Sequence, residues 1–119
     1  MSGVDANRRV RWPFWLHQLG EYLIAATLLV SAWYSPEPAV QATLGLLIFV
    51  NAAFAKGPAG AFQLIDRAVH KWFDIVILVM LVVAAVQGWF GVGTVGRIAL
   101  PTMAGLMFVL WIRTDFSEA

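Results

Sequence analysis

Two short segments pair a histidine with a carboxylate four residues later: His17 precedes Glu21, and His70 precedes Asp74. In an α-helix, four residues turn the chain by about 40° and advance it by about 6 Å, so the members of each pair share one helical face. Both pairs stand near the start of a long apolar run, where ionisable side chains are costly and mark functional sites. These four residues are therefore the best candidates for chemistry.

Two imidazoles and two carboxylates form a suitable ligand set for a divalent metal such as zinc, iron or manganese. Asn51, on another apolar run, adds an oxygen donor or a group that supports the ligands. The same acids could instead load and release protons for coupled transport. The candidate cation or proton site consists of His17, Glu21, Asn51, His70 and Asp74, and its metal ligands would be His17, Glu21, His70 and Asp74.

Two other interpretations stay open. A b-type haem could be held between His17 and His70, but this leaves both carboxylates unexplained, so a haem anchor is the less favoured alternative. The polar groups could also be purely structural, because a carboxylate near a helix start is favoured by the helix dipole. In that case the acids would pair with nearby cations, namely Arg11, Arg67, Lys71 or Arg113.

Composition indicates how these residues are positioned. Of 119 residues, 61% are hydrophobic and 13% are charged, whereas charged residues make up about a quarter of a typical soluble domain. Four apolar runs approach the length of about 20 residues that a membrane-spanning helix needs. We expect an all-α, polytopic integral membrane protein, with four transmembrane helices in one compact up-down bundle that occupies residues 1–119. The predicted spans are approximately 13–34, 38–55, 70–90 and 95–113.

The basic residues predict an orientation. Seven of the eight lie beside the ends of the spans that would share one side, and only Arg97 lies on the other. Because loops rich in lysine and arginine remain in the cytoplasm, both termini should be cytoplasmic in an inner (plasma) membrane, with residues 1–10 as a flexible tail. The residues that set this topology are Arg8, Arg9, Arg11, Lys56, Arg67, Lys71 and Arg113.

The chain also resembles two helical hairpins in tandem. His17 and His70 are 53 positions apart, and each begins a segment with the same order of features. The first and third spans would enter the membrane from the same side, so a bundle could gather both histidine–acid pairs at one depth. Pro101 should kink the fourth span, because proline lacks the N–H that bonds to the preceding turn. The helical spacing over Ala59–His70 suits either a surface helix or an extension of the third span.

The sequence contains no conventional enzyme signature, neither a glycine-rich phosphate loop nor a serine nucleophile elbow. We therefore expect a non-catalytic accessory subunit of a larger membrane complex, or a small transport component. Its partners would be the lipid bilayer and other membrane subunits or copies of itself. Nucleic acid is not expected as a partner, because membrane topology already accounts for the basic residues. The alternatives are a transporter that binds metal or protons through the two pairs, and the haem anchor.

Overall fold

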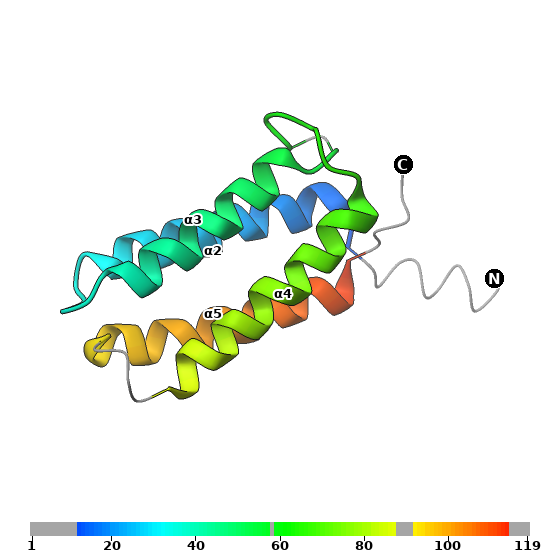
Figure 1. Cartoon of the computed structure of the whole chain (residues 1–119). Helices are drawn as coiled ribbons and strands as arrows, with labels where there is room; N and C mark the ends of the chain where they lie inside the picture. Colours follow the sequence, from blue (N-terminus) through cyan, green and yellow to red (C-terminus); the bar gives the residue numbers. More distant parts are fainter. Residues whose placement is uncertain (1–11, 58, 88–91, 115–119) are drawn as a thin grey trace.

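The computed structural model describes residues 12–57, 59–87 and 92–114, which form a compact bundle of four helices (Figure 1). The helices are α2 (Phe14–Ala32), α3 (Ala39–Phe54), α4 (Arg67–Val86) and α5 (Gly93–Arg113). This confirms the all-helical bundle. The tail at residues 1–10, with Arg8 and Arg9, and Arg11 lie outside the described residues.

Two of the four helices, α4 and α5, are long and apolar enough to cross a membrane. Helix α3 is equally apolar in character but shorter, at 16 residues. By length and composition, two helices are candidate membrane spans. This is a coarser result than the four spans that the sequence predicts.

Prolines and a glycine fix where the helices begin. Pro13 directly precedes α2, and Pro38 directly precedes α3, where a missing backbone N–H costs nothing because the first turn of a helix leaves its N–H groups unpaired. Gly93 begins α5 with a positive φ of 72°, a conformation that L-residues adopt only with strain. Helix α5 then continues through Pro101 to Arg113.

The helices form a ring in which α2 and α4 lie diagonally opposite each other. Helix α2 packs against α3 and α5, and α4 packs against the same two neighbours. The centre is filled by a cluster of buried apolar side chains contributed by all four helices. Its fully buried members include Leu28, Ile48, Leu81, Leu100 and Met107.

The connection between α3 and α4 is an ordered loop, so the helical spacing over Ala59–His70 is misleading. Helix α4 begins only at Arg67, and the preceding residues fold back on the end of α3. The backbone N–H of Lys56 donates to the Ile65 carbonyl at 2.8 Å, and the N–H of Leu64 donates to the Phe54 carbonyl at 2.7 Å. Two glycines in this loop favour turns over a continuous helix.

Four of the five described basic residues gather at one end of the bundle, as the orientation argument requires. Lys56, Arg67, Lys71 and Arg113 lie in the α3–α4 loop, the first turns of α4 and the last turn of α5. In Figure 1 these segments occupy the same end as the start of α2. Arg97 lies near the start of α5, at the opposite end.

Replacement of Gly45 by valine should destabilise the bundle, because α3 packs tightly against α2 at this position. A β-carbon at Gly45 would lie 3.0 Å from the Ala25 carbonyl oxygen and 3.2 Å from Leu28 Cβ, so overpacking should cost about 1–3 kcal/mol in the free energy of unfolding. Gly105→Val is the matched control, since a β-carbon at Gly105 meets no atom within 4 Å. Reversible unfolding in detergent micelles measures both, and equal stabilities would contradict this packing.

Candidate functional site

The two histidine–acid pairs occupy equivalent positions on the diagonal helices. His17 and Glu21 are the fourth and eighth residues of α2, and His70 and Asp74 are the fourth and eighth residues of α4. Both helices begin at the basic end of the bundle (Figure 1). Because each helix turns this face toward the axis, the four side chains meet at the centre, about two turns inside the bundle.

The four side chains form a ring of alternating nitrogen and oxygen atoms. His17 Nε2 lies 2.8 Å from Asp74 Oδ2 and 3.1 Å from Glu21 Oε1. His70 Nε2 lies 2.7 Å from Glu21 Oε1 and 3.2 Å from Asp74 Oδ2. The shorter contact of each histidine is thus with the acid of the other helix, so the cluster joins α2 to α4 across the bundle.

All four side chains are fully buried, so the stability of the cluster depends on the balance of its charges. One ligand atom from each residue lies within 4.8 Å of those from the others, so two carboxylates stand close together in an apolar interior. An uncompensated buried charge costs several kcal/mol, and two adjacent anions cost more. With both carboxylates ionised, the cluster therefore needs about two compensating positive charges, supplied either by two imidazolium groups or by one divalent cation.

The outer nitrogen of each histidine is committed as a hydrogen-bond donor. His70 Nδ1 donates to the Asn51 carbonyl at 3.0 Å. The Thr114 hydroxyl donates its hydrogen to the Leu110 carbonyl, so its oxygen is an acceptor for His17. His17 Nδ1 therefore donates to Thr114 Oγ1 at 2.8 Å. With Nδ1 protonated, both Nε2 atoms face the carboxylates. Metal-binding histidines use this arrangement, in which the second nitrogen donates to an oxygen and fixes the ring.

Asn51 holds one carboxylate and leaves the other less restrained. Its side-chain Nδ2 donates to Asp74 Oδ1 at 2.8 Å, so both oxygens of Asp74 have partners. Glu21 Oε2 and Asn51 Oδ1 are buried and have no hydrogen-bond partner among the described residues. Buried oxygen atoms without partners cost about 1–3 kcal/mol each. This is unused acceptor capacity of the kind a cation would satisfy.

Sequence reasoning missed the residues that cover the site. Phe14 lies against both imidazoles, with ring centroids 5.7 Å from His17 and 5.4 Å from His70. The guanidinium of Arg67 lies 4.6 Å above the Phe14 ring. These first residues of α2 and α4 form what we call the Phe14–Arg67 cap. In the sequence, the only sign of this contact is that Phe14 and Arg67 stand at equivalent positions, three residues before His17 and His70.

Thr114 and Gln18 were also missed. Thr114, directly after α5, accepts a hydrogen bond from His17. Gln18, the next residue after His17, is fully buried. The Gln18 amide donates to the Ala55 carbonyl at 3.2 Å and accepts from the Ala59 N–H at 3.1 Å, which fixes the α3–α4 loop against α2. Neither residue stands in a pattern that sequence inspection could separate from ordinary polar positions.

The structure places all five predicted site residues together. It pairs the carboxylates with the two histidines, while Arg67, one of the cations considered as their partner, lies over Phe14 and donates to the Lys56 carbonyl. The basic residues Lys71 and Arg113 remain at the same end of the bundle, and Lys71 lies over the Trp111 ring at 5.4 Å.

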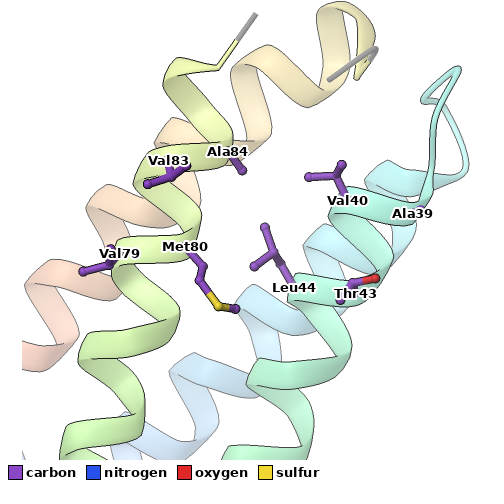
Figure 2. Close-up of a pocket in the computed structure, with 8 residues that line it drawn as sticks. All are labelled: Ala39, Val40, Thr43, Leu44, Val79, Met80, Val83 and Ala84. Atoms are coloured by element: carbon purple, nitrogen blue, oxygen red, sulfur yellow. The ribbon is translucent and has the colours of Figure 1, made fainter. Parts of the chain in front are cut away.

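None of the four ring residues lines the open surface hollow between α3 and α4 that Figure 2 shows. The volume of this hollow is about 460 Å³. Its lining is almost entirely apolar: Ala39, Val40, Thr43, Leu44, Val79, Met80, Val83 and Ala84. The start of α3 and the end of α4 lie away from the basic end, so this hollow is suited to lipid or protein contacts and does not reach the charged ring.

The ring is close to the size that a bound metal requires. Ligands about 2.0–2.1 Å from a metal lie about 2.9–3.3 Å from their neighbours, depending on the bond angle. The four nitrogen–oxygen separations span 2.7–3.2 Å. Adjacent ligand atoms along the ring are therefore already about as far apart as neighbouring ligands of one metal ion. The described residues offer two imidazole nitrogens and two carboxylates for this purpose.

Comparisons with protein-family models, with curated proteins and with solved structures found no match to this chain. The functional argument therefore depends on the geometry of the cluster and on the character of the surrounding surface.

Replacement of Asp74 by leucine should strongly destabilise the metal-free protein, because it leaves the imidazole charges with one carboxylate. Loss of one partner from a buried ion cluster costs about 3–5 kcal/mol. Asp66→Leu is the control: Asp66 forms an exposed pair with Lys56 at 3.0 Å, and such a pair contributes no more than about 1 kcal/mol. Unfolding in micelles with a chelator present measures both variants. If both variants lose the same free energy of unfolding, Asp74 does not compensate the charge of the histidines.

Proposed function

We propose that this protein binds one divalent transition-metal cation inside a four-helix membrane bundle, near the cytoplasmic face. The observation that carries the proposal is the buried ring of His17, Glu21, His70 and Asp74, in which both Nδ1 atoms donate outward and both Nε2 atoms face carboxylates. Mixed imidazole and carboxylate ligands suit zinc, iron and manganese. The protein would act without catalysis, as a small transport component or a subunit of a larger membrane complex.

The surface supports insertion of all four helices into the bilayer. Large apolar side chains are exposed on every helix, including α2 and α3, and a soluble monomer rarely exposes so continuous an apolar surface. The exposed residues include Leu23 and Val30 on α2, Leu46 and Phe49 on α3, Val76 and Val79 on α4, and Ile98 and Phe108 on α5. With the basic end in the cytoplasm, four spans would place the ring near the inner leaflet.

The ring geometry favours a metal ion over haem. The imidazole centroids are 5.5 Å apart and nearly perpendicular, with carboxylates between their Nε2 atoms. Phe14 contacts both rings from the basic end. A porphyrin between the histidines would have to displace both acids and separate the diagonal helices. The same acids are direct ligands when the occupant is a single cation.

Access to the ring differs between the two ends of the bundle. On the basic side the Phe14–Arg67 cap lies over it. On the other side, buried apolar side chains fill the bundle over several helical turns, among them Leu28, Ile77 and Leu81. We expect cations to enter and leave from the basic side. Passage across the membrane would need a second conformation or a partner subunit.

The metal proposal predicts one divalent cation per chain in the purified protein and weaker binding in His70→Gln. Removing a group that supports a ligand typically lowers metal affinity by about 10–100-fold. Removing a ligand itself should lower it more, so the affinity of His70→Gln should fall by more than about 100-fold. Titration calorimetry with Mn²⁺ and elemental analysis measure this. Glu37→Gln, in the turn before α3, is a control for altered polarity and should bind like the wild type. A wild-type protein that binds no metal but copurifies with a larger membrane assembly would instead favour the accessory-subunit role.

The orientation proposal can be tested by cysteine labelling, because the chain contains no cysteine. Single cysteines at Glu37 and Gln63 occupy connections at opposite ends of the bundle. A thiol reagent that cannot cross membranes should label Glu37→Cys in intact cells and label Gln63→Cys only after permeabilisation. The reverse pattern, or equal labelling, would contradict a four-span protein with a cytoplasmic basic end.

A further inference from the structure

The two carboxylates of the ring differ in how their second oxygens are used. Asp74 turns Oδ2 to the histidines and receives a hydrogen bond from Asn51 on Oδ1. Glu21 turns Oε1 to the histidines, while its Oε2 is buried without a hydrogen-bond partner among the described residues. The two acids are therefore chemically inequivalent although their helical positions are the same.

This inequivalence determines how each acid can bind a cation. Asp74 is held to one metal-facing oxygen, because a second metal bond would require it to give up the Asn51 amide. Glu21 is free to turn both oxygens to the ion, since its second oxygen forms no competing bond. A cation contact would also remove the cost of burying that oxygen unpaired.

We propose that Glu21 chelates the cation through both oxygens while Asp74 binds through one, giving a five-ligand site of two imidazole nitrogens and three carboxylate oxygens. This inference rests on the proposed metal-binding function and specifies its cation class. Zinc in protein sites is most often four-coordinate and tetrahedral, whereas oxygen-rich sites of higher coordination number suit manganese and ferrous iron. The preferred ions are therefore Mn²⁺ and Fe²⁺.

Cobalt reports the coordination number directly, because tetrahedral Co²⁺ absorbs visible light far more strongly than five- or six-coordinate Co²⁺. The wild-type protein loaded with Co²⁺ should show weak visible bands. Glu21→Gln should show a several-fold rise in absorptivity, because an amide offers one oxygen to the metal and the site loses a ligand. Glu37→Gln is the control: it makes the same acid-to-amide change in the turn before α3, outside the ring, so its bands should stay as weak as those of the wild type.

The outcomes separate this inference from the proposed function. Wild-type protein that binds no Co²⁺ would overturn the metal site itself. Intense tetrahedral bands in the wild type, or unchanged bands in Glu21→Gln, would overturn chelation by Glu21 while leaving metal binding intact. If a variant fails to fold or to bind Co²⁺, X-ray absorption of the cobalt-loaded wild type decides: five nearest nitrogen and oxygen neighbours support the inference, and four overturn it.

Discussion

The bundle depends on the neutralisation of two carboxylates buried in an apolar interior. Glu21 and Asp74 are fully buried, and one oxygen of each lies within 4.8 Å of one oxygen of the other. Neither could stay ionised there alone, because the cost of removing a charge from water exceeds what the surrounding dispersion contacts return. The two histidines, or a cation that they help to bind, meet this requirement. The ring therefore determines which face of α2 and which face of α4 turn inward.

This requirement also explains the polar groups outside the ring. With Nδ1 protonated, each histidine needs an acceptor for that N–H, which Asn51 provides from α3 and Thr114 from the end of α5. Each hairpin thus supports the histidine of the other hairpin. The apolar core beyond the ring fills the bundle on the opposite side.

The two helical hairpins have similar lengths and similar helix starts. The second hairpin repeats the helix starts of the first at offsets of 53 residues for α2 and α4 and 54 for α3 and α5. The short histidine–acid contacts run crosswise between the two hairpins. The repeat is incomplete, since Phe14 corresponds to Arg67 and only Asp74 has an amide partner. That asymmetry is what would make one acid a chelating ligand and the other a single-oxygen ligand.

The sequence by itself determined that the protein is a helical bundle, and it identified His17, Glu21, His70 and Asp74 as the residues to examine. Apolar runs and spacings of four depend only on local helical periodicity, so they can be read along the chain. Tertiary structure decided the rest: the diagonal placement of α2 and α4, the ordered α3–α4 loop, and the roles of Phe14, Gln18 and Thr114. These depend on which groups meet across the bundle, and contacts between residues as distant as His17 and Thr114 leave no periodic signal in the sequence.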